Sequence, residues 1–199
     1  MTNILVTGGA GFIGSNFVRY MVNKYSEYNI INLDALTYCG NLENLIDIED
    51  KDNYSFVKGD IRDKEVVDEL VKDCDYIINF AAESHVDNSI KDPNIFFKTN
   101  VIGCVNMLNI AKDLGLRFHQ VGTDEVYGVT WPRDNCYEGS MIKPSSPYSS
   151  SKASADLIAL SYFKTFGTKV TVSRCTNNLG PWQHSEKLIP TVISRAFED

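Results

Sequence analysis

The sequence predicts an α/β fold in which helices cover both faces of one parallel sheet, the doubly wound arrangement. Short runs rich in β-branched residues alternate with longer segments of helical periodicity along the whole chain. A glycine-rich turn follows the first of these runs, as expected where a strand leads into a helix. No internal repeat or Pro/Gly/Ser-rich linker divides the 199 residues, so we expect a single domain over residues 1–199.

Six short apolar runs are predicted to form the strands. In chain order they cover residues 4–6, 30–33, 55–57, 76–80, 118–121 and 170–172. Between and after them lie helical patterns near residues 13–25, 64–73, 94–114, 148–166 and 187–198. The segment 64–73 shows the reasoning, because its valines and Leu70 form one apolar stripe at helical spacing. Strands joined by helical crossovers pair in parallel.

Composition places the chain among ordinary globular proteins. Hydrophobic residues make up 43% and charged residues 23%, and 19 Lys and Arg against 26 Asp and Glu leave a formal charge of −7. An acidic surface argues against broad binding to nucleic-acid phosphates or to a membrane surface. No segment approaches the roughly 20 apolar residues that span a bilayer, and the N-terminus lacks a signal-peptide pattern. We therefore expect a cytoplasmic protein without nucleic-acid or membrane partners.

The five cysteines are odd in number and widely scattered. No two have the C-x-x-C spacing, and none stands close to a histidine in a zinc-like pattern. The sequence therefore predicts free thiols of a reducing compartment, and no metal site. The residues concerned are Cys39, Cys74, Cys104, Cys136 and Cys175.

A glycine-rich turn at residues 8–14 links the first predicted strand to the first predicted helix. Its sequence, GGAGFIG, satisfies G-x-G-x-x-G and predicts a loop that a pyrophosphate can approach closely at a helix N-terminus. Asp34 ends the second strand, where a carboxylate can bind both ribose hydroxyls and repel a 2′-phosphate. Because Ala35 follows and no arginine is near in sequence, the pattern predicts NAD rather than NADP. A glycine turn that binds nothing is the alternative.

Tyr148 and Lys152 stand four residues apart behind Pro147, which is suited to the first turn of a helix. Residues four apart share a helix face, so the ammonium can lie beside the phenol. Half-ionisation at neutral pH requires a phenol pKa about 3 units below its ordinary value, and one ammonium about 4 Å away supplies that much at a dielectric of about 20. The pair predicts a general base that deprotonates an alcohol while hydride leaves its carbon.

Thr123, Asp124 and Glu125 follow the fifth predicted strand, at the sheet edge where open α/β folds bind ligands. If one carboxyl is protonated and the other ionised, the pair can act as acid and base in one elimination. Neighbouring strand residues point to opposite faces, so both carboxyls reach one substrate only if the backbone leaves the strand here. The alternative is that these residues only cap a helix or turn and take no part in catalysis.

Together these motifs resemble the extended short-chain dehydrogenase/reductase superfamily, and within it the nucleotide-sugar 4,6-dehydratases, chiefly those of the dTDP-glucose type. The most specific segments are AAESHVD and GTDEVYG, because related epimerases lack the Asp-Glu pair. The resemblance implies a Rossmann-type NAD-binding fold. The matching segments run through the whole chain: TGGAGFIGSNFV, NLDALTYCGNLENL, GDIRD, NFAAESHVDNSI, FKTNVIG, GTDEVYG, SPYSSSKA and RCTNNLGPWQHSEKLIP.

The resemblance also implies a role for each matching residue. Thr123 would bind the sugar hydroxyl that is oxidised, Asp124 would be the acid, Glu125 the base, and Tyr148 with Lys152 the base of the first step. Substrate would contact Ser84, Thr123, Asn177, Lys187 and Leu188. NAD would be bound by Gly8, Gly11, Phe12, Ile13, Gly14, Asp34, Ala35, Leu36, Thr37, Asp60, Ile61, Phe80, Ala81, Ala82, Glu83, Ser84, Thr99, Tyr148, Lys152 and Asn178.

The implied reaction converts a nucleotide-diphosphate glucose to its 4-keto-6-deoxy sugar, as in rhamnose-type deoxysugar biosynthesis. Oxidation at C4 makes the C5 hydrogen acidic, water is lost across C5 and C6, and the hydride returns to C6. Departures from the family pattern at Ala35, Gly122 and residues 179–185 concern substrate details. The alternatives are a UDP-glucose carrier, an epimerase or reductase, or an NAD-binding module without turnover.

Two further expectations come from the resemblance alone. Family members extend well beyond residue 199, so we expect this chain to lack most of their C-terminal substrate domain. The helices near 94–114 and 148–166 correspond to those that pair across the family's dimer, which implies a homodimer.

Overall fold

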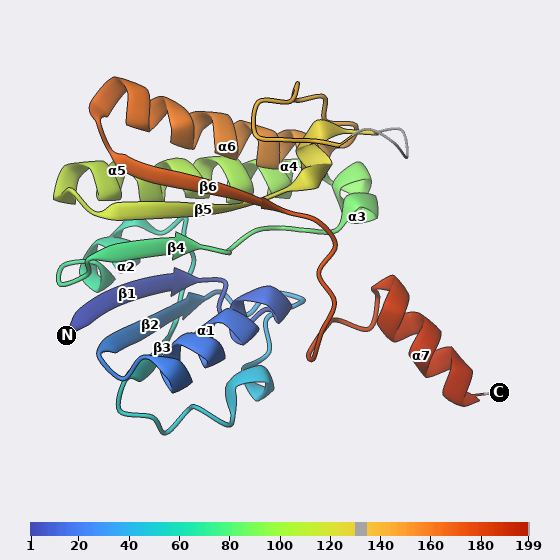
Figure 1. Ribbon diagram of the computed structural model, residues 1–199, viewed down its shortest axis with the longest axis horizontal. Helices are drawn as coiled ribbons and strands as arrows, with labels where there is room; N and C mark the ends of the chain where they lie inside the picture. The colour runs from blue at the N-terminus through green and yellow to red at the C-terminus, as the bar shows by residue number, and fades with distance from the viewer. Residues whose placement is uncertain (130–134, 199) are drawn as a thin grey trace.

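The computed structural model describes residues 1–129 and 135–198, so the predicted domain end at Asp199 lies outside the described residues. Its centre is a six-stranded sheet in the order β3-β2-β1-β4-β5-β6, with every neighbouring pair parallel (Figure 1). The predicted strands are all confirmed, with small shifts at their ends. They are β1 (Thr2–Thr7), β2 (Tyr28–Asp34), β3 (Tyr54–Lys58), β4 (Tyr76–Asn79), β5 (Arg117–Thr123) and β6 (Lys169–Cys175).

The helical segments follow the predicted pattern with one clear difference. The expected single helix near 94–114 is three consecutive segments, because a π-helical stretch interrupts it. Short segments that the sequence pattern did not predict also occur at η1, α3 and η3. In order, the helices are α1 (Phe12–Lys24), η1 (Leu42–Leu45), α2 (Lys64–Leu70), α3 (Val86–Lys91), α4 (Pro93–Phe96), η2 (Phe97–Gly103, π-helical), α5 (Cys104–Leu114), η3 (Asp124–Tyr127), α6 (Pro147–Phe166) and α7 (Leu188–Glu198).

Alternate residues of β1 supply two separate cores, one on each face of the sheet. Ile4 and Val6 point to the face that α1 and η1 cover, where they pack with Val18 and Leu45. Leu5 points to the other face and joins the cluster formed with α2, α5 and α6. All five side chains are buried. Burial on both faces explains why the strand sequences read as continuous apolar runs, and it confirms the doubly wound prediction.

The outer strands are covered less completely. Thr171 and Ser173 of β6 are exposed and hydrogen-bond the ring of His119 on β5, at 2.8 Å from Nδ1 and 3.0 Å from Nε2. No helix among the described residues packs on these three side chains. Partial burial lowers the pKa of His119. This polar face contrasts with the opposite face of the same strands, where Phe118 is fully buried under α5 and α6.

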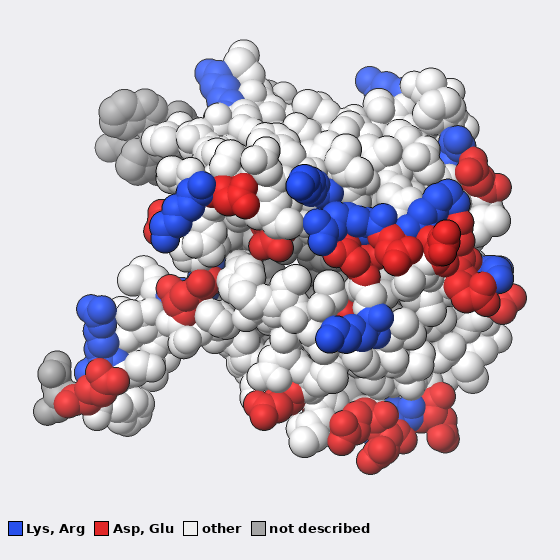
Figure 2. All heavy atoms as spheres, turned by 180° about the vertical axis from the view of Figure 1, so that it is seen from behind, with Lys and Arg blue, Asp and Glu red and all other residues white. Residues whose placement is uncertain are grey.

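Helix α7 extends away from the sheet and buries none of its residues (Figure 1). Its exposed apolar side chains include Leu188, Ile189, Val192, Ile193 and Phe197. Across the described part of the chain, no helix is both long and apolar enough to span a membrane. The face seen in Figure 2 mixes both signs of charge, with Lys and Arg lying beside Asp and Glu.

Candidate active site

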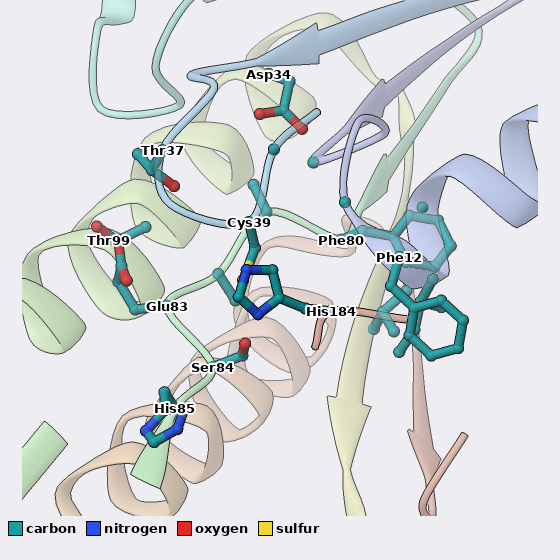
Figure 3. Close-up of a pocket in the computed structure, with 18 of the residues that line it drawn as sticks. Phe12, Asp34, Thr37, Cys39, Phe80, Glu83, Ser84, His85, Thr99 and His184 are labelled. Atoms are coloured by element: carbon teal, nitrogen blue, oxygen red, sulfur yellow. The ribbon is translucent and has the colours of Figure 1, made fainter. Parts of the chain in front are cut away.

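One cleft of about 760 Å³ opens at the carboxyl ends of the strands, next to the reversal of strand order between β1 and β4. Ligands bind at this kind of position in open α/β sheets. The cleft brings together nearly all the predicted site residues, and Figure 3 shows part of its lining. Three predicted residues do not line it: Leu36, Asp124 and Leu188.

The glycine turn has the close packing that the motif requires. Gly8 has a φ of +71°, and a Cβ on it would lie 2.6 Å from the backbone nitrogen of Ala81. A Cβ on Gly14 would lie 2.2 Å from the carbonyl oxygen of Gly8. Gly11 is the N-cap of α1 and leaves the first N–H groups of the helix without a side-chain cap. The turn can therefore accept a diphosphate against bare backbone.

Asp34 is held at the end of β2 by two backbone groups. Its Oδ2 accepts from the N–H of Ala10 at 2.9 Å, and its Oδ1 accepts from that of Leu36 at 2.8 Å. Burial raises the pKa of Asp34, and these two hydrogen bonds oppose the shift. A carboxylate has about four acceptor positions, so two remain for ribose hydroxyls. Leu36 supports Asp34 through its backbone, in the left-handed region with φ 51°, while its side chain packs on the core beside α1.

Arg62 is a cleft residue that sequence reasoning missed. The sequence shows no arginine near Asp34, yet the turn after β3 brings Arg62 into the same cleft. Its Nη2 lies 2.6 Å from Oδ2 of Asp60, and this pairing lowers the pKa of Asp60. Asp60 accepts three hydrogen bonds from this guanidinium, so Arg62 already has a carboxylate partner, and we retain the expectation of NAD rather than NADP.

Residues 80–84 after β4 form the middle of the cleft floor, and one buried amide anchors them. Oδ1 of Asn100, in η2, accepts from the N–H of Glu83 at 2.8 Å. Nδ2 of Asn100 donates to the carbonyl of Glu83 at 3.0 Å and to Oγ of Ser151, on α6, at 2.8 Å. Thr99, beside Asn100, lines the cleft (Figure 3). The π-helical turn thus places a polar anchor between this loop and α6, which is typical of π-turns at functional sites.

Tyr148 and Lys152 lie on the first turns of α6. Ser146 is the N-cap, Pro147 occupies the first turn, and Ser149 completes a capping box, so the helix start is fixed as predicted. The Nζ of Lys152 donates to the carbonyl of Val121 at 2.7 Å. Burial lowers the pKa of Lys152, and the negative charge of Asp156 opposes that shift.

The expected lowering of the Tyr148 pKa is not found. Burial raises the pKa of Tyr148 to about 12, a hydrogen bond with Thr123 opposes the shift, and the charge of Glu125 adds to it. The reason is geometric, because the ammonium of Lys152 binds the β5 backbone while the phenol lies in a buried site facing a carboxylate. A cationic group beside the phenol would be needed to bring this pKa down.

The backbone leaves β5 where the sequence argument required it to. Asp124 begins η3, and Thr123 caps it by accepting from the N–H of Glu125 at 3.3 Å. The Thr123 hydroxyl also donates to Oδ1 of Asp124 at 3.4 Å. Glu125 lines the cleft and Asp124 does not. The capping interpretation is therefore correct for Thr123, and the geometry still brings Thr123, Glu125 and Tyr148 to one end of the cleft.

The opposite wall comes from the segment after β6. Asn177, Asn178 and Lys187 line the cleft, as does Ser84 from the loop after β4. Leu188 begins α7 and is 75% exposed, so no contact of it supports the predicted substrate role. Sequence reasoning did not assign four further residues that line the cleft: His85, Trp182, Gln183 and His184.

Cys39 and His184 lie close together in the structure, an approach that their sequence spacing did not indicate. Donor atoms of Cys39, His184 and Glu186 all lie within 4.8 Å of one another, although the residues are far apart in sequence (Figure 3 shows Cys39 and His184). Burial raises the pKa of the Cys39 thiol. Nζ of Lys187 lies 3.5 Å from Glu186, so the carboxylate already has a cationic partner. We assign no metal to this cluster.

Comparison with known proteins agrees with this geometry. A family model described as GDP-mannose 4,6 dehydratase matches residues 5–198. The chain belongs to the GDP-mannose 4,6 dehydratase family. The sequence resemblance to nucleotide-sugar 4,6-dehydratases is thereby confirmed.

Proteins named as dTDP-glucose 4,6-dehydratases are among those similar to the chain. The chain is 51% identical over 98% of its length to the low-salt glycan biosynthesis protein Agl12 of Haloferax volcanii, of which it covers 62%. It is 46% identical over 98% of its length to a dTDP-glucose 4,6-dehydratase of Mycobacterium tuberculosis, of which it covers 59%. The crystal structure of a dTDP-glucose 4,6-dehydratase from Bacillus anthracis, solved with NAD, aligns with a TM-score of 0.92 and 52% identity over all of this chain and 62% of that one. The chain therefore spans about 60% of the length of the relatives it matches.

Proposed function

We propose that the protein dehydrates dTDP-glucose to the 4-keto-6-deoxy sugar in an NAD-dependent lyase reaction. The observation that supports this most directly is the convergence of Thr123, Glu125 and Tyr148 at one end of a dinucleotide-sized cleft. The relatives named as dTDP-glucose 4,6-dehydratases favour the same substrate for this chain. Deoxysugar biosynthesis would be the setting of this activity.

The residues fit NAD. The glycine turn leaves no room for a Cβ at Gly8 or Gly14, Asp34 retains two acceptor positions, and the 80–84 loop continues the groove. When bound, NAD supplies a hydride acceptor that becomes the hydride donor at the end of the cycle. We also propose that Phe12, Ile13, Thr37, Ile61 and Asn178 line this groove, as their positions in the cleft support.

The chain's own residues divide the proton transfers between them. Thr123 would bind the C4 hydroxyl, and Tyr148 would accept its proton. The positive charge of the oxidised cofactor would lower the phenol pKa, as would Lys152 once its ammonium turns from the Val121 carbonyl toward the phenol. Glu125, which lines the cleft, would then remove the C5 proton that the new ketone acidifies. Asp124 would protonate the departing C6 hydroxyl after its carboxyl turns from Thr123 toward the cleft. Glu125 would return its proton to C5 as the hydride returns to C6. The proton held by Tyr148 would pass through solvent to Asp124, so that all three groups regain their starting protonation states.

The test is incubation of the purified protein with dTDP-glucose and, separately, UDP-glucose, followed by the absorbance of the 4-keto product in alkali. We expect product from dTDP-glucose, and bound NAD in the purified protein. Product from UDP-glucose alone would show that the nucleotide carrier is UDP and not dTDP. An epimerised sugar without the 4-keto product would show that the protein is an epimerase and not a dehydratase.

A second candidate function is NAD binding without turnover. It is favoured by the positions of Asp124 and Leu188 outside the cleft. Bound NAD with no product from either sugar would select it.

We also propose a cytoplasmic homodimer. The five free thiols support a reducing compartment. Phe97 and Ile102 on η2, together with Leu157 and Phe163 on α6, are exposed apolar side chains that a second copy can cover. Light scattering after gel filtration should give twice the 22.3 kDa mass of the chain, and a monomer across micromolar concentrations would exclude the dimer.

A further inference from the structure

Arg174, on β6, joins two segments that carry the proposed catalytic residues. Its Nε donates to Oδ2 of Asp156, on α6, at 2.8 Å. Its Nη1 donates to the hydroxyl of Tyr127, the last residue of η3, at 2.9 Å. The guanidinium also lies over the Tyr127 ring, 5.3 Å from its centroid. One side chain therefore bridges the segment of Asp124 and Glu125 to the helix of Tyr148 and Lys152.

The pair is buried at a cost to stability. The Asp156 side chain is fully buried and that of Arg174 is 11% exposed. Oδ1 of Asp156 has no hydrogen-bond partner among the described residues. A buried ion pair with an unsatisfied oxygen stabilises little, because desolvation offsets the attraction. Its arrangement is better explained by the geometry that it imposes than by the stability that it adds.

The neighbouring strand is shaped to admit this carboxylate. A Cβ on Gly122 would lie 2.9 Å and 3.0 Å from the two oxygens of Asp156, and 2.6 Å from the carbonyl of Ser173. Only a glycine allows α6 to approach β5 this closely at the position just before Thr123. The approach sets the distance between the strand end that carries the acid–base pair and the helix that carries the phenol.

Helical spacing transmits this restraint along α6. Tyr148, Lys152 and Asp156 are four residues apart, so all three share one helix face. Fixing Asp156 against Arg174 therefore fixes the rotation of α6 that aims Tyr148 at Thr123. Fixing Tyr127 against the same guanidinium anchors the end of η3, two residues after Glu125.

We propose that Arg174 is a positioning residue that holds Glu125 in register with Tyr148, so that C5 deprotonation follows C4 oxidation of the same bound sugar. This role rests on the proposed dehydratase function. Arg174 does not line the cleft. Loss of its bond to η3 should slow proton removal by Glu125 while leaving oxidation by Tyr148 intact.

The decisive variant is Tyr127→Phe, which removes one hydrogen bond to Arg174 and keeps the ring. In single turnovers with dTDP-glucose, the rise of reduced nicotinamide should be unchanged within about twofold, and its decay should slow about tenfold, as expected for loss of one hydrogen bond to a charged group. Tyr162→Phe is the matched control, because it loses a 2.8 Å bond to Asn109 between α6 and α5. Equal slowing of both phases, or of neither, would overturn the proposal.

A measurement without substrate separates this proposal from the proposed function. Amide hydrogen exchange at residues 124–128 should accelerate about tenfold in Tyr127→Phe and stay unchanged in Tyr162→Phe, whether or not the wild type forms product. Arg174→Lys, which keeps the charge and loses the fork, should reproduce the Tyr127→Phe pattern. Unchanged exchange in Tyr127→Phe and in Arg174→Lys would show that η3 is held by other contacts. A wild type without product but with the expected exchange would refute only the dehydratase.

Discussion

The two halves of the sheet build their parts of the cleft in different ways. Around β1, β2 and β3 the site is made of backbone: a glycine turn without space for side chains and a carboxylate fixed by two N–H groups. Around β5 and β6 it depends on charged side chains that are largely buried: Lys152 lines the cleft, while Asp156 and Arg174 form an ion pair outside it. The first half depends on local conformation, and the second depends on contacts between segments far apart in sequence. Substitutions should therefore fail for different reasons in the two halves.

Asp156→Asn should give the largest effect on stability. It leaves Arg174 buried without its counter-charge, which costs about 3–5 kcal/mol of unfolding free energy. Asp60→Asn makes the same chemical change in the other half, where the Asp60 and Arg62 side chains are 31% and 37% exposed, and should cost under about 1 kcal/mol. Urea denaturation compares the two. Similar losses of unfolding free energy in the two variants would show that buried charges do not distinguish the β5–β6 half from the half around β1, β2 and β3.

Gly14→Ala should give the next largest effect, and it tests the backbone-built half. The new Cβ would meet the Gly8 carbonyl at 2.2 Å, so the turn must shift, at about 1–3 kcal/mol and with loss of NAD affinity. Gly11→Ala is the control within the same turn, because its Cβ would lie 3.5 Å from the same oxygen, an ordinary contact. Urea denaturation without NAD should separate the two variants. Equal losses of unfolding free energy would mean that the turn is more adaptable than its packing indicates.

The smallest expected effect concerns His119 on the polar outer face of β5. Burial lowers its pKa in the folded protein, so the unfolded chain binds more protons than the folded one below the ordinary value near 6.5. The unfolding free energy should therefore fall as the pH drops through that value. It should recover when the pH is raised and the ring is neutral in both states. His119→Gln should flatten this part of the stability–pH curve. An unchanged curve would show that the dependence has another source.

The sequence predicted what depends on neighbouring residues. The six strands, the glycine turn, Asp34 and the Ser146–Pro147 helix start could all be recognised from short patterns. The exit of the chain from β5 at Asp124 was stated as a condition, and the structure meets it.

What sequence reasoning missed depends on contacts between segments that are far apart in the sequence. The pKa of Tyr148 rises because burial and Glu125 act on it and because Lys152 turns to the Val121 carbonyl. Arg62 reaches the cleft from a separate strand end. Cys39 and His184 meet across two loops, and helix spacing alone gives no sign of either approach.

The π-turn that carries Asn100 has a consequence for protein design. A designer who regularised this helix by deleting one residue would rotate every side chain on one side of the deletion by about 100° relative to the other. Asn100 would then lose its three bonds to Glu83 and Ser151, and the 80–84 loop would lose its only side-chain anchor to α6 among the described residues. An improvement by the standards of helix geometry would thus detach the cleft floor from the helix that bears Tyr148.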